Sequence, residues 1–240
     1  MPILLNLWPI AVMAMDWLAV IRSRRRLEYI AKPAAMLALL AWLWIDSRGG
    51  VGNAPLLWFA LGLVCSLAGD VLLLLPERFF LPGLVAFLLA HLAYIYGLNA
   101  GGIMWLTETL LAIPMAIIGG WLVWRIGGAL RAKGRGKLLA PIVLYAVIIS
   151  LMVVSALATL FRSDWPVGPA ALVSAGAVLF FLSDVVLAWN RFLAPLPHGR
   201  VVVIVAYHLG QLALILGAAR MVEALPWIVY GYAALAFSLK

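Results

Sequence analysis

Apolar residues occur along the chain in eight long runs that short polar connections separate. The runs cover residues about 4–21, 30–45, 55–75, 80–98, 103–125, 138–161, 168–190 and 200–220. A helix needs about 20 mostly apolar residues to cross the hydrocarbon core of a bilayer. We therefore predict an all-α, polytopic transmembrane bundle of eight helices. The stretch 224–238 contains Pro226 and is short for a crossing, so it is either an interfacial tail or a ninth helix.

The composition also indicates a membrane protein. Of the 240 residues, 67% are hydrophobic and only 11% are charged, whereas soluble domains have about 45 to 50% apolar and about 25% charged residues. A soluble globule of this length cannot bury so many apolar side chains. We interpret residues 1–240 as one transmembrane domain, with no room for a separate soluble catalytic domain. The single cysteine, Cys65, excludes an intramolecular disulfide and a cysteine-rich metal site.

Basic residues concentrate in every second connection between the runs. Thirteen Lys and Arg residues lie in or beside the first, third, fifth and seventh connections, and three lie in the others. The positive-inside rule predicts that the basic connections face the cytoplasm and its anionic headgroups, with the N-terminus outside. The net charge of +8 therefore indicates a bilayer as the partner and not nucleic acid. If the protein is bacterial, we expect it in the inner membrane. Residues 22–26 are basic and follow the first run, which predicts a retained helix and not a signal peptide.

A weak repeat relates the two halves of the chain. Three residue pairs recur at offsets of 114, 117 and 108 positions: Asp70 and Asp184, His91 and His208, Pro33 and Pro141. The spacing indicates two related four-helix halves. Because four crossings return the chain to the same side of the membrane, the halves would run in parallel about an axis along the membrane normal.

Three aspartates lie within the predicted membrane spans. An Asp at the bilayer centre costs roughly 2.5 to 3.5 kcal/mol on insertion scales, so an intramembrane carboxylate is by default a functional candidate. Asp16, Asp70 and Asp184 each lie about five or six residues from the basic end of their helix, hence at similar depth. They could meet in one cavity that opens towards the cytoplasm. Asp16, on the first helix, is expected to be interfacial and not catalytic.

Helical spacing places further polar residues on shared faces. The pairs three or four residues apart are Ser66 and Asp70, His91 and Tyr94, and Tyr207 and Gln211. Arg191 follows Asp184 towards the basic end of its helix. We expect these faces to line a polar cleft.

Five segments carry a resemblance to a known family. They are Lys32-Pro33, SLAGDVLLLLP at 66–76, FLLAHLAY at 87–94, FLSDVVLAWNRF at 181–192, and Tyr207-x-x-Gly210-Gln211. In order and interval, these segments resemble the lysoplasmalogenase (YhhN-like) family of eight-helix membrane proteins. The resemblance extends from about residue 30 to residue 220, and His208 is not part of the pattern.

The resemblance implies hydrolysis of the vinyl ether bond of a lysoplasmalogen, a lysophospholipid. The products would be a fatty aldehyde and glycerophospho-ethanolamine or glycerophospho-choline. Such a reaction protonates the outer vinyl carbon and forms an oxocarbenium ion, which water then attacks. It needs one protonated carboxylic acid and one carboxylate that stabilises the cation and activates water. Two aspartates in a low-dielectric cleft can supply both forms.

The resemblance also implies roles for individual residues. Asp70, Asp184 and His91 are the expected catalytic residues, and no metal or other cofactor is expected. Lys32 and Arg191 are expected to bind the substrate phosphate. The other expected substrate-binding residues are Asn190, Ser66, Ser183, Tyr94, Tyr207 and Gln211. The sequence does not give the oligomeric state or the headgroup preference.

Other functions remain open on the sequence alone. Asp70 and Asp184 could simply hydrogen-bond helices together. A metal-dependent membrane hydrolase could use His91, the two aspartates and His208, although no HxxxH or HExxH spacing is present. A proton-coupled transporter could also use paired halves and intramembrane aspartates. His198, between two prolines and a glycine, is expected to be an exposed turn residue.

Overall fold

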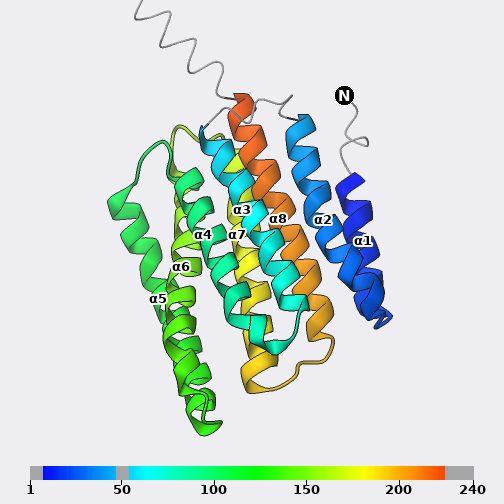
Figure 1. Cartoon of the computed structure of the whole chain (residues 1–240). Helices are drawn as coiled ribbons and strands as arrows, with labels where there is room; N and C mark the ends of the chain where they lie inside the picture. Colours follow the sequence, from blue (N-terminus) through cyan, green and yellow to red (C-terminus); the bar gives the residue numbers. More distant parts are fainter. Residues whose placement is uncertain (1–7, 47–53, 225–240) are drawn as a thin grey trace, which may run out of the picture.

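The computed structural model describes residues 8–46 and 54–224, and all regular structure in these residues is helical (Figure 1). The eight α-helices are α1 (Trp8–Ile21), α2 (Arg25–Asp46), α3 (Ala54–Leu74), α4 (Phe80–Leu98), α5 (Trp105–Ala132), α6 (Leu139–Ala158), α7 (Val167–Ala188) and α8 (Gly199–Ala224). Short 3₁₀ segments precede α4 and α6 and follow α6. A π-helical segment, Trp189–Leu193, continues α7. The predicted all-α bundle is confirmed.

Seven of the eight helices are long and apolar enough to cross a membrane. The described part of α1 is apolar but has 14 residues, and residues 4–7 of the predicted first run lie outside the described residues. Large apolar side chains cover the outside of the bundle. On α5, for example, Trp105 and Leu106 are each 76% exposed. Such a surface is unfavourable in water but suits lipid chains, so the protein is an integral multi-pass membrane protein.

Two predicted helix boundaries differ most from the structure, and α8 ends at Ala224 and not at about residue 220. The helix α2 begins at Arg25 and not at about residue 30, because its first, polar turn remains helical ahead of Pro33. Lys32 therefore lies within the helix and not at its start. The helix α5 continues to Ala132 and not to about 125, because Ile126 and Leu130 are buried. The predicted tail, 224–238, lies outside the described residues apart from its first position.

The helix contacts in the two halves correspond. In the first half α1 packs on α2, α2 on α3 and α3 on α4; in the second half α5 packs on α6, α6 on α7 and α7 on α8. Between the halves, α4 contacts α6 and α8 contacts α2, which are equivalent pairs in the repeat. The helix α8 also contacts α1 and α3, so the packing follows the repeat in part.

The four basic connections lie at the same end of the bundle, the lower end in Figure 1. Ion pairs link side chains there: Arg135 contacts Glu77 at 3.0 Å, and Arg200 contacts Glu28 at 2.7 Å. We refer to this end as the basic end. That it faces the cytoplasm remains a prediction from the charge asymmetry.

A topology test follows from this asymmetry. A reporter fused after Lys137, in the connection between α5 and α6, is expected to report a cytoplasmic location, because basic connections resist translocation. A matched fusion after Asp164, between α6 and α7, should report the opposite side. External activity of the Lys137 fusion would contradict the predicted orientation.

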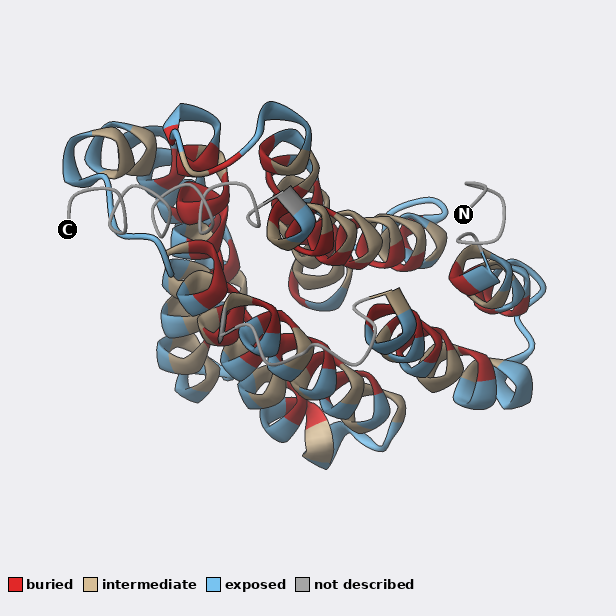
Figure 2. Ribbon diagram, turned by 90° about the horizontal axis from the view of Figure 1, so that it is seen from above, coloured by how far each residue is buried: buried red, intermediate tan, exposed pale blue. Residues whose placement is uncertain are grey.

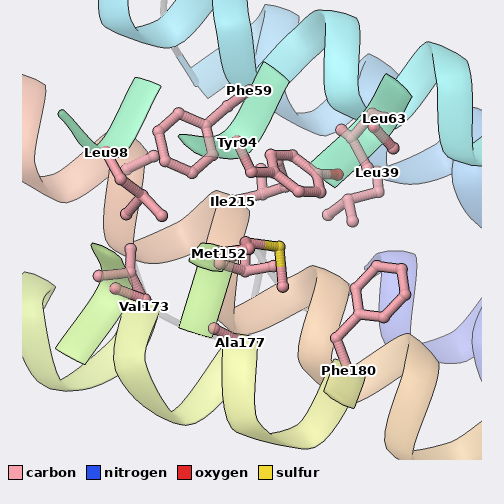
Figure 3. Close-up of a cluster of buried hydrophobic side chains, with 14 of the residues drawn as sticks. Leu39, Phe59, Leu63, Tyr94, Leu98, Met152, Val173, Ala177, Phe180 and Ile215 are labelled. Carbon is pink, nitrogen blue, oxygen red and sulfur yellow. The ribbon is translucent and has the colours of Figure 1, made fainter. Parts of the chain in front are cut away.

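Buried side chains occupy the helix sides that face one another, and exposed ones face outwards (Figure 2). The main core cluster brings together aromatic and aliphatic side chains of the central helices (Figure 3). The helices α7 and α8 approach closely where glycines face each other. A Cβ at Gly176 would lie 2.6 Å from the backbone nitrogen of Leu214, and one at Gly210 would lie 2.9 Å from the Gly176 carbonyl oxygen. This close packing fixes the position of Tyr207 relative to α7.

Candidate active site

A cavity of about 110 Å³ lies inside the bundle, between α4, α5, α6, α7 and α8, with Asp70 of α3 in its wall. We call it the inner cavity. Most of its lining is apolar, from residues such as Phe87, Leu122 and Ile149. The polar side chains in the wall are Lys32, Asp70, Tyr145, Ser183, Asp184 and Tyr207. Both predicted catalytic aspartates therefore face one mainly apolar space.

Asp70 is fully buried and has a cationic partner. The Lys32 Nζ lies 2.9 Å from Asp70 Oδ1, and the Tyr207 hydroxyl donates a hydrogen bond of 2.7 Å to Asp70 Oδ2. The Lys32 side chain is only 14% exposed. This ion pair is thus largely shielded from water. Removing one partner of such a buried pair is costly, because it leaves the other charge buried and unpaired. Lys32, expected to bind phosphate, contacts a catalytic candidate in the structure.

Asp184 has a neutral partner. The Tyr145 hydroxyl, from α6, donates a short hydrogen bond to Asp184 Oδ2. Tyr145 was not among the predicted site residues, although the sequence contains a signal for it. Applying the 114-residue offset between the two aspartates to Lys32 gives position 146, next to Tyr145. The two halves of the chain therefore each contribute an aspartate and a partner from the preceding helix.

A second polar cluster lies behind Asp70. The Tyr94 hydroxyl donates to Gln211 Oε1 at 2.6 Å, and Gln211 Nε2 donates to Ser66 Oγ at 2.8 Å. All three side chains are buried, and none lines the inner cavity. They connect α3, α4 and α8. The structure brings these predicted residues together, and their hydrogen bonds hold α3, the helix that carries Asp70, against α4 and α8.

Ser183 and Asn190 both contact the backbone. The Ser183 hydroxyl lines the inner cavity and donates to the Val203 carbonyl at 3.0 Å. The Asn190 Oδ1 accepts a hydrogen bond of 2.7 Å from the backbone N–H of Leu196. Asn190 thereby closes the turn between α7 and α8.

His91 is buried beside the site and does not line the inner cavity. Its ring lies 4.8 Å from that of Phe180 and 5.2 Å from that of Tyr145, measured between centroids. Neither ring nitrogen hydrogen-bonds to another group in residues 8–46 or 54–224. His91 thus packs against Tyr145, which in turn hydrogen-bonds to Asp184.

Asp16 is separate from the other two aspartates. It is fully buried within the bundle. Its Oδ2 lies 3.9 Å from His208 Nε2, and the Trp17 Nε1 donates to His208 Nδ1 at 3.0 Å. These residues connect α1 to α8 and do not line the inner cavity. Asp16 therefore does not join Asp70 and Asp184 in one cavity.

A larger cavity of about 480 Å³ adjoins the inner cavity on the side of the basic end. We call it the vestibule. Lys32, Leu73, Phe80, Leu187, Val203 and Ile204 line both spaces. The vestibule is more polar than the inner cavity, and its charged lining residues are Arg25, Glu28, Lys32, Arg191 and Arg200. Lys32 thus lies where the charged vestibule meets the apolar inner cavity, a junction that we call the neck.

Arg191 occupies the π-helical segment after α7, a type of distortion that is frequent at functional sites. Its guanidinium lies 3.9 Å from the centroid of the Phe80 ring and 3.7 Å from Glu77 Oε1. These contacts hold the cation at the wall of the vestibule. Arg191 therefore presents its cation to the vestibule.

Metal coordination was one alternative for this site. Among the residues that the structure describes, no group of three or more His, Cys, Asp or Glu side chains is arranged to hold a metal ion. His208, which would have completed such a group, lies with Asp16 and Trp17.

A model of the YhhN family matches residues 27–218. The chain belongs to the YhhN family. It is 34% identical to lysoplasmalogenase TMEM86B of Homo sapiens over 191 residues, which cover 80% of this chain and 75% of the relative. The same protein of Sus scrofa is 30% identical over 200 residues, 82% of this chain and 77% of the relative. No solved structure matches the chain significantly.

The YhhN-family segment contains every predicted site residue, from Lys32 to Gln211, and also Tyr145. Asp16 and Arg25 lie outside it. The inner cavity and its two carboxylates are therefore built by the part of the chain that defines the family.

Proposed function

We propose that this protein hydrolyses the vinyl ether bond of lysoplasmalogens. The products are a fatty aldehyde and glycerophospho-ethanolamine or glycerophospho-choline. Relatives named lysoplasmalogenase, about one third identical over most of the chain, support this reaction. The observation that carries the proposal is that Asp70 and Asp184 face one apolar cavity, which adjoins a charged vestibule.

The two adjoining spaces suit a single-chain phospholipid. Its phosphate fits the vestibule beside Arg191, and the first carbons of the apolar chain fit the inner cavity. The vinyl ether joins these two parts of the substrate, so it would lie at the neck marked by Lys32. Asp70 and Asp184 both line the inner cavity beside that neck.

The different partners of the aspartates suggest different roles. The cation of Lys32 favours the ionised form of Asp70, because an opposite charge nearby stabilises a carboxylate. Asp184 is hydrogen-bonded to the neutral hydroxyl of Tyr145 and is the better candidate for the protonated acid. Related halves with unequal partners would thus provide one acid and one base, as in glycosidases with paired carboxylates.

The reaction then proceeds in three steps. Asp184 delivers its proton to the outer vinyl carbon, and the electron pair of the ether oxygen forms the oxocarbenium ion. Asp70 stabilises this cation and accepts a proton from the water that attacks it. The hydroxyl of the resulting hemiacetal gives its proton back to the Asp184 carboxylate, and its carbon breaks the bond to the glycerol oxygen. Asp70 passes its proton to that oxygen, and the aldehyde is released with both aspartates restored. Tyr145 stabilises the Asp184 carboxylate after proton transfer.

The remaining residues support this arrangement. Tyr207 orients Asp70 directly, and Ser66, Tyr94 and Gln211 hold the helices behind it. His91 packs on Tyr145 and is best assigned as a positioning residue for Asp184.

Product analysis tests the reaction class. Purified protein in detergent is expected to release aldehyde from an alkenyl lysophospholipid and no fatty acid from an acyl lysophospholipid. The carboxylate pair is suited to protonate the carbon of a vinyl ether, whereas an acyl ester has no such carbon to protonate. Mass spectrometry of both reactions checks this. Fatty acid release with no aldehyde would contradict the proposal.

A further inference from the structure

The vestibule contains one ion pair that connects two helices across it. Arg200, in the first turn of α8, contacts both carboxylate oxygens of Glu28 on α2, with Nη2 at 2.9 Å from Oε1 and 2.7 Å from Oε2. The Glu28 side chain is 14% exposed and the Arg200 side chain is 55% exposed. Both line the vestibule. The pair therefore presents a cation and an anion side by side to this cavity.

The charges around the vestibule are unequal. Its described lining contains Arg25, Arg191 and Arg200, and Lys32 is engaged by Asp70. Glu28 is the only carboxylate among these lining residues. An anion in the vestibule has several cationic partners, whereas a cation has one carboxylate to contact. A ligand with one negative and one positive group matches this distribution.

The order of the residues along α2 also matches such a ligand. Lys32, Glu28 and Arg25 lie on one face, with Glu28 about 6 Å from Lys32 along the helix axis towards the basic end. In an ethanolamine or choline lysoplasmalogen, the phosphate follows the glycerol and the ammonium group follows the phosphate. A vinyl ether at the neck would therefore put the phosphate and the ammonium group in the vestibule, which Glu28 and Arg200 line.

We propose that Glu28 and Arg200 form a subsite for a zwitterionic headgroup. Arg200 binds the phosphate, together with Arg191, and Glu28 binds the ammonium group. This inference rests on the proposed function for the position of the substrate. Binding would replace the Glu28–Arg200 contact: the ammonium group takes the place of Arg200 at Glu28, and the phosphate takes the place of Glu28 at Arg200. Because Arg200 is exposed, opening this ion pair costs little stability.

The test separates binding from hydrolysis. Saturated ether lysophospholipids have no vinyl group and cannot be cleaved in this way, so their Kd reports headgroup recognition alone. Three are compared: the ethanolamine form, the choline form and the phosphate monoester without an amine. In Glu28→Gln, affinity for the first two is expected to fall about tenfold, since a charged contact is lost. Affinity for the monoester should stay the same or rise.

A control and the alkenyl substrates complete the experiment. Glu223 also pairs with an arginine, Arg220 at 2.5 Å, but at the opposite end of the bundle. Glu223→Gln is expected to leave all three affinities unchanged. An equal loss for all three ligands in Glu28→Gln, or no loss for any, would overturn the subsite. Headgroup-selective binding without aldehyde from the matching alkenyl lipids would instead refute the proposed reaction and leave the subsite intact.

Discussion

Asp184→Asn is expected to lower kcat for aldehyde release at least about 100-fold, the lower end of typical general acid contributions. Asparagine has nearly the same shape as aspartic acid and can accept the hydrogen bond from Tyr145. It cannot deliver a proton to carbon. The variant should therefore bind substrate and keep its site geometry while losing the first step of the reaction.

The fold is expected to survive this substitution. Asp184 makes no ion pair in the described structure, and its exchange for a neutral side chain removes the cost of a buried carboxyl group. Thermal unfolding in detergent should therefore be close to that of the wild type. Asp46→Asn is a matched control, because Asp46 ends α2 on the side of the bundle opposite the basic end. This variant should retain full activity.

The same mechanism predicts how the substitutions combine. Asp70→Asn should also lower kcat at least about 100-fold, and the double variant should be little worse, since the two groups act as a unit. Wild-type turnover in D₂O should place deuterium on the carbon next to the aldehyde carbonyl, measured before that position exchanges. Two folded single variants with near wild-type aldehyde release would refute the acid and base pair.

The helices were predictable because membrane crossing imposes a simple length and polarity requirement on each one. The shared faces of Asp70, Tyr207 and Gln211 also followed from helical spacing, because each of these polar side chains needs a partner within an apolar bundle. Which helix supplies the partner depends on how the helices pack, and spacing within one helix carries no such information. Tyr145 was missed for this reason.

Two misplacements have specific physical causes. Asp16 was assigned by its depth alone, but depth does not fix the direction in which a side chain points. In the structure it faces α8 and His208, away from the inner cavity. Lys32 was assigned to a helix start because the apolar run begins only at about residue 30. With α2 beginning at Arg25, Lys32 is turned to the neck of the cavity and reaches Asp70.

The position of Lys32 makes its removal the second test with a large expected effect. Lys32→Met would leave the Asp70 carboxylate buried without its cation, a change that costs about 3 to 5 kcal/mol when a buried pair is broken. Asp70 would then be neutral in a large fraction of the protein molecules, and a neutral Asp70 cannot stabilise the oxocarbenium ion. We expect kcat to fall at least about 100-fold and the thermal stability to fall with it.

Two further variants distinguish this role from phosphate binding. Lys32→Arg retains the charge and should recover part of both activity and stability. The double variant Lys32→Met with Asp70→Asn removes both charges, so it should regain stability but not activity, because replacing both members of a buried pair is often tolerated. A residue that only binds phosphate would act equally in the ground and transition states, and Lys32→Met would then raise KM at nearly constant kcat. That result, with stability unchanged, would return Lys32 to the headgroup and remove the basis for assigning Asp70 as the base.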